Sequence, residues 1–274
     1  MGKAESAFSR SMTIEDTTMG WRFINPVMRQ QYGVDTMPET AEAAAREYAI
    51  SRDAQDAFAL RSQQRVAASY AKEVFTDELL PVRVPQRRGE DILFIKDEHP
   101  RETSLQDLAR LKGVVRPEGS VTAGNASGIN DGACALLVAS EAGARRHDLV
   151  PRARIIASAA AGVEPRFMGM GPVPAVEKVL QRAGLALAQM DVIELNEAFA
   201  AQALAVLQTL HIEPESPRVK PNGGAIALGH PLGASGARLV TTAYYQLLRT
   251  RGRYALCTMC VGVGQGIAVI IERL

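Results

Sequence analysis

The sequence predicts an α/β protein with a layered sheet, and the alternation of strand-like and helix-like segments after residue 120 is the main reason. Apolar runs typical of buried strands cover 154–161 and 192–195, and helical patterns follow them at 173–183 and 198–210. Most of the 23 glycines also lie after residue 120, where they allow tight turns. Alternating strands and helices imply helices on both faces of the sheet.

The end of the chain predicts a hairpin. A helix is expected over 235–248, and two strands are expected over 254–259 and 267–271. These two strands are too close in sequence for a helical crossover, so antiparallel pairing is expected. A further helix is expected over 133–146, with Cys134 packed in its apolar run.

The more polar region before residue 120 predicts short helices and one small hairpin. Thr40 and Ser51 are candidate N-caps for its first two helices, and Gly89 is expected in the turn of the hairpin. The opening 36 residues show little periodicity, which is typical of a loop excursion. The expected elements are helices at 40–48, 52–72 and 104–111 and strands at 81–84 and 91–95.

Composition excludes several classes of protein. The 274 residues carry 31 Lys and Arg against 30 Asp and Glu, a net charge of +1, with no block of basic residues. Nucleic-acid binding is therefore not expected, because neutralising phosphates requires a basic surplus. No apolar run reaches the ~18 to 20 residues of a membrane span, and the N-terminus predicts no secretory signal.

The three cysteines predict free thiols and a reducing, cytoplasmic location. Cys260 precedes a Gly-x-Gly-x-Gly run, which brings backbone donors beside a thiol whose pKa can be tuned. Cys257 is expected on the opposite face of the same strand, as core packing. A redox or zinc Cys-x-x-Cys pair is the alternative, but no second cysteine pair accompanies it.

Three motifs indicate acyl chemistry, because each places a polar side chain at a strand end or a strand-to-helix turn. Their glycines allow backbone N–H groups to approach a ligand, as an oxyanion hole requires. His230 lies between Gly229 and Pro231, on a constrained turn. The motifs are Asn-Glu-Ala-Phe-Ala at 196–200, the Gly-rich run with His230 at 222–236, and Cys-Val-Gly-Val-Gly-Gln-Gly at 260–266.

These motifs, in this order, resemble the signatures of thiolases, and segments 121–132 and 168–172 are also thiolase-like. Within the family, 20–26 and 32–42 look most like the 3-oxoadipyl-CoA thiolases of aromatic catabolism. The resemblance implies a layered αβαβα fold with a mixed sheet in the C-terminal half. It also implies thiolytic cleavage of a 3-oxoacyl-CoA, with coenzyme A as substrate and neither cofactor nor metal.

The resemblance also implies roles for individual residues. Cys260 matches the acid/base cysteine, and His230 matches the histidine that activates the nucleophile and stabilises an oxyanion. Asn196 matches the asparagine that holds the water of that oxyanion hole, and Gly262 matches an N–H donor of the other hole. Coenzyme A contacts are implied for Ser127, Arg101, Met37, Met168 and Phe199, for which plain packing or a solvated charge is the alternative.

One family element has no counterpart. The nucleophilic cysteine of thiolases lies in a Cys-Gly-Ser-Gly-like stretch of the N-terminal domain, and no such stretch occurs in this sequence. The chain is therefore expected to start just inside the loop domain, leaving the N-terminal half incomplete. The implied parts are a CoA-covering loop domain at 1–119, the tail of the N-terminal domain at 120–150, and the C-terminal domain at 151–274.

Several alternatives stay open at this stage. The chain is either part of a 3-oxoadipyl-CoA thiolase, part of an acetoacetyl-CoA or general 3-ketoacyl-CoA thiolase, or a non-catalytic remnant. Thiolases are dimers or tetramers, so a homo-oligomer is implied for the complete family. Arg22 and Arg29 are candidate partners for a distal substrate carboxylate, since guanidinium binds carboxylate in a bidentate manner. Exposed apolar faces are expected where the N-terminal strands would pack.

Overall fold

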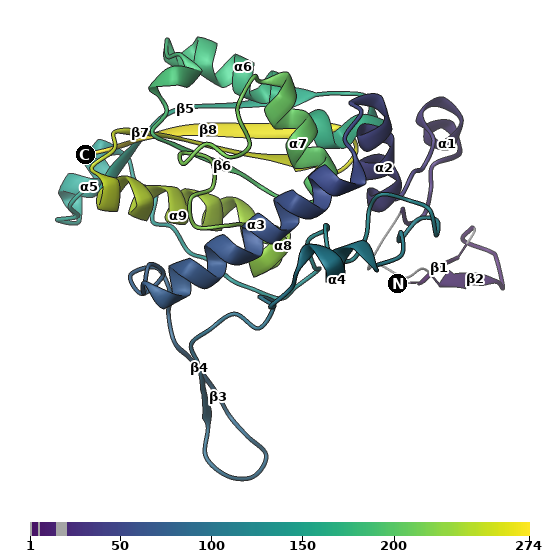
Figure 1. Ribbon diagram of the computed structural model, residues 1–274, viewed down its shortest axis with the longest axis horizontal. Coiled ribbons are helices and arrows are strands. Elements are labelled where there is room, and N and C mark those ends of the chain that lie inside the picture. Colours follow the sequence, from purple (N-terminus) through teal and green to yellow (C-terminus); the bar gives the residue numbers. More distant parts are fainter. Residues whose placement is uncertain (1, 5, 15–20) are drawn as a thin grey trace.

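The structure is a computed structural model that describes residues 2–4, 6–14 and 21–274, and it is an α/β arrangement (Figure 1). Most of its helices and strands lie where the sequence predicts them. The strands are β1 (Gly2–Ala4), β2 (Met12–Ile14), β3 (Val82–Val84), β4 (Ile92–Phe94), β5 (Ala153–Gly162), β6 (Val192–Leu195), β7 (Tyr254–Val261) and β8 (Gln265–Arg273). The helices are α1 (Pro26–Tyr32), α2 (Met37–Glu47), α3 (Arg52–Ala71), α4 (Leu105–Ala109), α5 (Glu141–Arg146), α6 (Pro172–Ala183), α7 (Ala200–Thr209), α8 (Ala225–Leu228) and α9 (Ser235–Thr250), with 3-10 turns η1 (Pro165–Met170) and η2 (Leu187–Gln189).

A four-stranded mixed sheet forms the centre of the C-terminal half, as predicted. Its strand order is β5-β8-β7-β6. Strands β7 and β8 pair antiparallel as the expected hairpin, and β5 joins β8 antiparallel. Strand β6 pairs parallel with β7, with Leu195 opposite Thr258. The end of β6 therefore lies next to the last residues of β7, and both ends open towards the same edge of the sheet.

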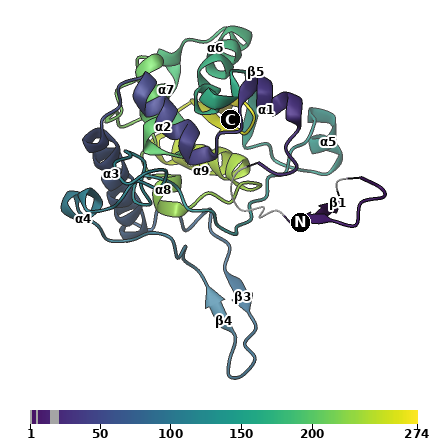
Figure 2. The same ribbon diagram turned by 90° about the vertical axis from the view of Figure 1, so that its right-hand side faces the viewer.

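Helices cover both faces of this sheet, and each face has its own apolar core (Figure 2). Helices α6 and α7 bury Val176 and Leu204 against Leu256 and Ile270 on one face. Helix α9 buries Leu239 and Leu247 against Cys257 and Ile271 on the other face. Cys257 thus packs as core on the α9 side, while Cys260 belongs to a different cluster. This agrees with the strand alternation that separates the two thiols.

The region before residue 120 packs its helices across the outside of α7 and α8. Helix α3 is the long helix that crosses the molecule in Figure 1, and Phe58 and Ala59 on its inner face join the core. Strands β3 and β4 form a hairpin arm that projects away from the body in both views (Figures 1 and 2). Ser51 caps α3 by accepting a hydrogen bond from Ala54 N at 3.1 Å, as predicted.

One predicted boundary in this region is wrong, and one helix was not predicted. Thr40 is not an N-cap but lies inside α2, which begins three residues earlier. Thr36 caps this helix instead, with its amide donating to the Glu39 side chain in a capping box at 2.7 Å. The opening 36 residues also contain α1, which the weak periodicity concealed. Its signals were local, namely Asn25 as N-cap, Pro26 as first residue and Gly33 at the end.

The predicted helix at 133–146 is present only as α5, in its last six residues. Residues 133–140 have no regular structure, so Cys134 does not pack inside a helix. It is half-buried, with its Sγ 3.4 Å from Thr241 Oγ1. The next apolar side chains face solvent, and Leu137 is 80% exposed. A short helix needs tertiary packing of its apolar face, and the described residues provide none here.

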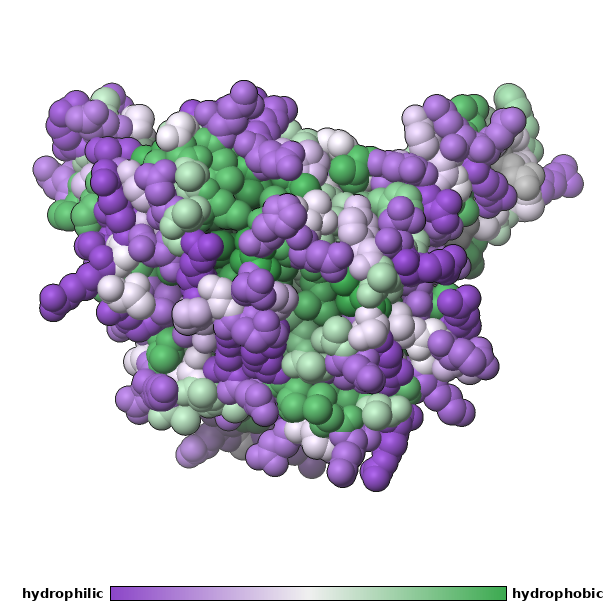
Figure 3. Space-filling model, turned by 45° about the horizontal axis from the view of Figure 1, so that its top comes forward, coloured by the Kyte–Doolittle hydropathy of each residue, from purple (hydrophilic) through white to green (hydrophobic). Residues whose placement is uncertain are grey.

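Apolar residues reach the surface on the face that carries α6 and β5, where Figure 3 shows green residues between hydrophilic ones. Elsewhere on the surface, Val138 and Val150 face solvent, and Ile155 on β5 is 53% exposed and lies opposite Ile271, on the α9 side of the sheet. Large exposed apolar patches mark surfaces that pack against other polypeptide. Within the described residues, none of the helices has the length and apolar character needed to cross a bilayer.

Candidate active site

The three sequence motifs meet at the edge of the sheet where β6 and β7 end. The first motif follows β6 directly, and the Asn196 amide donates to Thr258 O of β7 at 3.0 Å. The third motif begins at Cys260, two residues further along β7. The second motif enters through α8 and the turn before α9, which carries His230. Topology therefore brings together residues that lie more than 60 positions apart in sequence.

Asn196 and His230 are in direct contact. Their side chains approach to 3.3 Å between Asn196 Nδ2 and His230 Nε2. Asn196 is fully buried, and its Oδ1 is without a hydrogen-bond partner among the described residues. A buried amide oxygen without a partner is costly, so it is suited to binding a water molecule or a ligand donor. The structure therefore brings these two predicted site residues into contact.

The backbone around His230 is held by the segment before residue 131. The His230 amide lies within hydrogen-bond distance of Gly128 O at 3.1 Å and Asn130 Oδ1 at 3.2 Å. Gly229 has φ of +92°, and a Cβ at that position would come within 2.3 Å of Asn130 Oδ1. Only glycine fits this close approach without displacing Asn130. The orientation of His230 is thus fixed by residues from two separate motifs.

Burial keeps His230 neutral. Its side chain is half-buried, and burial, followed by the positive charge of Arg238, lowers the pKa of His230 to about 4. A neutral imidazole near pH 7 can accept a proton on one ring nitrogen, which is what a general base requires.

Cys260 lies in a small apolar cluster with several predicted coenzyme A contacts. It is 5% exposed and packs with Met168 and Ala198, while Met37 and Phe199 lie against this group. Burial raises the pKa of the Cys260 thiol to about 12. The thiol is therefore protonated in the described structure, and a proton donor is the role that this state supports. The apolar surroundings of Cys260 exclude water from the thiol.

The turn after Cys260 exposes the backbone of Gly262. A methyl group at Gly262 Cα would lie 3.6 Å from Met37 Cε, so this glycine faces the cluster around Cys260. The turn also contains Val263 at φ of +69°, a left-handed conformation that is rare for a β-branched residue. Such strain costs about 1 to 3 kcal/mol and is often found at functional sites.

Ser127 and Arg101 lie on the loop side of the site. Ser127 is bound to Ala198, since both its amide and its hydroxyl donate to Ala198 O, at 3.0 and 3.1 Å. The Arg101 amide donates to Gln63 Oε1 at 3.1 Å, and the residue is exposed. The structure therefore brings Ser127 to the cluster, whereas it leaves the Arg101 guanidinium at the surface.

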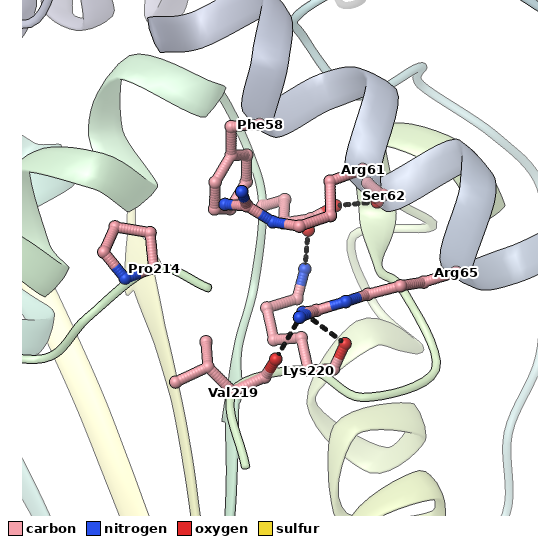
Figure 4. Close-up of a pocket in the computed structure, with 8 residues that line it drawn as sticks. Phe58, Arg61, Ser62, Arg65, Pro214, Val219 and Lys220 are labelled. Atoms are coloured by element: carbon pink, nitrogen blue, oxygen red, sulfur yellow. Dashed lines mark hydrogen bonds and ion pairs between the residues drawn. The ribbon is translucent and has the colours of Figure 1, made fainter. Parts of the chain in front are cut away.

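A buried ion pair beside the site was not predicted from the sequence. Lys220 and Glu197 form this pair, and both are almost completely buried, at 1% and 2% exposure. Figure 4 shows Lys220 reaching towards α3 in a small pocket, with Phe58 and Arg65 around it. Ser62 Oγ donates to Glu197 Oε2 at 2.7 Å, and the Ile226 amide donates to the same oxygen at 3.0 Å. The pair therefore connects α3, the end of β6 and α8.

A second buried carboxylate lies close behind this pair. Glu194 on β6 has no exposed surface, and both of its oxygens are without a partner among the described residues. Burial raises the pKa of Glu194 to about 7, while Lys220 and Arg238 act in the opposite direction. This cluster could not be predicted from the sequence, because the alternation of polar and apolar residues along a strand does not distinguish a buried glutamate from an exposed one.

The arrangement supports proton transfer. It combines a neutral imidazole, a protonated thiol and a glycine-rich turn next to the thiol. Within the residues that the structure describes, no group of three or more His, Cys, Asp or Glu side chains is placed to hold a metal ion. Acyl transfer through an oxyanion-stabilised intermediate uses these groups.

Fold and site together define an α/β protein of the acyl-transfer class. The chain belongs to the thiolase family. The family model described as the thiolase N-terminal domain matches residues 2–142, and the one described as the C-terminal domain matches residues 149–273.

Individual relatives agree with this assignment. The chain is 63% identical over 275 residues to a beta-ketoadipyl-CoA thiolase of Acinetobacter baylyi. It is 60% identical to the 3-oxoadipyl-CoA/3-oxo-5,6-dehydrosuberyl-CoA thiolase of Escherichia coli K12. Each match covers 100% of this chain and 69% of the relative.

Solved structures show the same fold. The acetyl-CoA acetyltransferase of Bacillus anthracis superimposes with a TM-score of 0.87 at 36% identity, covering 100% of this chain and 68% of that protein. Human mitochondrial 3-ketoacyl-CoA thiolase in complex with CoA gives a TM-score of 0.80 at 43% identity, covering 87% of this chain and 59% of that protein. These matches confirm the predicted thiolase-like fold.

Proposed function

We propose that this chain carries the proton-transfer half of a thiolase that cleaves 3-oxoadipyl-CoA with coenzyme A to succinyl-CoA and acetyl-CoA. The observation that supports the proposal most strongly is the contact of Asn196 with His230, at the same sheet edge as Cys260. The identities of 60 to 63% to relatives named for this substrate support the choice of acyl group.

The residue roles follow from the chemistry of the site. The buried Cys260 thiol donates its proton to the departing acetyl-CoA enolate and takes one from the methyl group in the reverse reaction. The His230 ring and a water on Asn196 stabilise the enolate-like oxygen. The Gly262 N–H serves the other oxyanion hole. Each lost oxyanion donor typically costs about 2.7 to 4 kcal/mol of barrier.

The nucleophilic cysteine comes from polypeptide outside these 274 residues in this proposal. Cys134 is half-buried against Thr241 and Cys257 is packed under α9, and neither thiol is hydrogen-bonded to His230 among the described residues. The exposed apolar residues Leu137, Val138 and Ile155 form the surface against which that polypeptide packs.

Coenzyme A and acyl-CoA are the proposed ligands, and no cofactor is required. Met37, Met168 and Phe199 form an apolar wall next to Cys260, and Ser127 lies on Ala198 at the edge of this wall. We assign Arg101 to the outer, phosphate-bearing part of the ligand, because its guanidinium is exposed. Residues 1–119 act as the CoA-covering domain, and 120–150 and 151–274 belong to the two thiolase domains. The complete assembly is a cytoplasmic homo-oligomer without nucleic-acid or membrane partners.

The substrate assignment is tested by thiolysis. The chain is combined with the part of the Acinetobacter baylyi relative that the match leaves uncovered, which supplies the nucleophile. We expect a higher kcat/KM for 3-oxoadipyl-CoA than for acetoacetyl-CoA. Equal or reversed preference would favour a short-chain thiolase instead, and no turnover above a chain with His230→Ala would favour a non-catalytic remnant. If Arg22→Ala or Arg29→Ala lowered kcat/KM for 3-oxoadipyl-CoA but not for acetoacetyl-CoA, that arginine would be identified as the partner of the substrate's distal carboxylate.

A further inference from the structure

The imidazole of His230 is held at both ring nitrogens. On one side, Nδ1 lies 2.6 Å from Ser235 Oγ, and on the other side, Nε2 lies 3.3 Å from Asn196 Nδ2. Ser235 is the first residue of α9 and has no exposed surface. Its short contact to Nδ1 is thus protected from water, and it connects the histidine to a helix that packs across the sheet.

Counting hydrogens decides which ring nitrogen carries the proton. A serine hydroxyl has one hydrogen, and Ser235 donates it to Pro231 O at 3.0 Å. With the hydroxyl hydrogen directed to Pro231 O, Ser235 Oγ acts as an acceptor for the ring, and this assignment places the ring proton on Nδ1. Nε2 is left with its lone pair, which accepts from the Asn196 amide group. The same tautomer satisfies both contacts.

The turn itself holds Ser235 Oγ in place. The Ser235 amide also donates to Pro231 O, at 2.9 Å, so backbone and hydroxyl close the same turn between His230 and α9. Neither Pro231 nor Ser235 is a titrating group, so this arrangement does not depend on pH. It persists whenever the ring is neutral.

We infer that Ser235 is a positioning residue that fixes His230 as the Nδ1–H tautomer and presents a bare Nε2 to the reacting groups. The significance of this tautomer rests on the proposed function. When a thiol gives its proton to Nε2, the S–H bond breaks, its electron pair stays on sulfur, and an N–H bond forms on the ring. The resulting imidazolium can donate the new Nε2–H to an oxyanion, and Ser235 still accepts from Nδ1–H.

The inference is tested without any substrate, by nitrogen-15 NMR of the imidazole rings in the 274-residue chain. The sequence has 4 histidines, and His230→Gln identifies the resonances of His230. We expect a protonated-type signal at Nδ1 and an unprotonated-type signal at Nε2 at neutral pH. In Ser235→Ala, the Nε2 signal is expected to move towards the protonated position, because the acceptor for Nδ1–H is lost.

Two further variants separate positioning from general disruption. Ser235→Thr keeps the hydroxyl and is expected to retain the wild-type tautomer. Ser69→Ala removes another buried hydroxyl, one that bonds to Asn222, and should leave the His230 signals unchanged. A protonated Nε2 in the wild-type chain would overturn the inference, as would an unchanged spectrum in Ser235→Ala. Because no turnover is measured, a failure of the proposed thiolysis would leave this result intact, and the reverse also holds.

Discussion

Replacing Lys220 with methionine is expected to lower the free energy of unfolding by about 3 to 5 kcal/mol, since removing one partner of a buried ion pair leaves an uncompensated charge. Glu197 would lose its paired cation while 2% exposed, and the hydrogen bonds from Ser62 and the Ile226 amide to its carboxylate would remain. Urea unfolding followed by circular dichroism measures the change.

The pH dependence of this defect has a definite sign. The pKa of Glu194 is raised by burial to about 7 although Lys220 acts to lower it, so removing Lys220 raises that pKa further. Between the ordinary pKa of glutamate and the raised pKa of Glu194, the folded protein binds more protons than the unfolded protein. The free energy of unfolding therefore falls as pH rises through this interval. We therefore expect the Lys220→Met defect to be smaller at pH 5 than at pH 8.

Arg61→Met is the matched control for this prediction. Arg61 pairs with Glu215 at 2.7 Å, but the Glu215 side chain is 69% exposed. Surface pairs of this kind contribute about 0 to 1 kcal/mol. If Lys220→Met and Arg61→Met destabilised the chain equally, the buried pair would not have the structural role assigned to it.

Replacing His230 with alanine is expected to reduce kcat/KM for thiolysis by about 10²- to 10⁴-fold in the reconstituted enzyme, the usual contribution of a positioned acid or base. Asn196→Ala is expected to cost about 10²- to 10³-fold, as for one oxyanion donor. The double variant should lose less than the product of the two effects, because Asn196 and His230 contact each other at 3.3 Å.

His211→Ala is the control for this experiment, because His211 lies exposed at the end of α7 and contacts none of the predicted site residues by any hydrogen bond in the structure. It should retain wild-type kcat/KM.

The double variant decides whether His230 and Asn196 act together. If its loss of kcat/KM equalled the product of the two single effects, the two side chains would act in separate places.

The sequence was most informative where a feature repeats or stands out locally. Alternation of strands and helices predicted the layered sheet with helices on both faces, and the short spacing of the last two strands predicted their antiparallel pairing. Gly-rich runs marked His230 and Cys260. The helix predicted at 133–146 does not extend over residues 133–140. An apolar pattern shows which side chains would be buried in a helix, but it does not show whether the described residues provide a surface to cover them.

The supporting residues of the site were not predictable in the same way. Lys220 follows an ordinary loop in sequence, and its burial results from Glu197, Ser62 and α3 meeting only in three dimensions. In the sequence, Ser235 is a small residue in a Gly-rich run. Its role depends on the hydrogen bond between its Oγ and His230 Nδ1. The Lys220 contacts join segments that lie far apart in sequence, and the hydrogen bond of Ser235 leaves no periodic pattern in the chain.

Exchange of the methyl hydrogens of acetyl-CoA with deuterium, catalysed by the 274-residue chain alone, tests most directly whether this chain carries the proton-transfer half of a thiolase site. The exchange needs Cys260 as base and the oxyanion donors near His230, but no acyl transfer. Because burial raises the pKa of Cys260 to about 12, the rate should increase with pH as the thiolate forms. We expect the wild-type chain to exchange about 10²- to 10⁴-fold faster than the Cys260→Ala variant. The Cys134→Ala variant should exchange at the wild-type rate. Equal exchange rates for the wild type and Cys260→Ala would contradict the account.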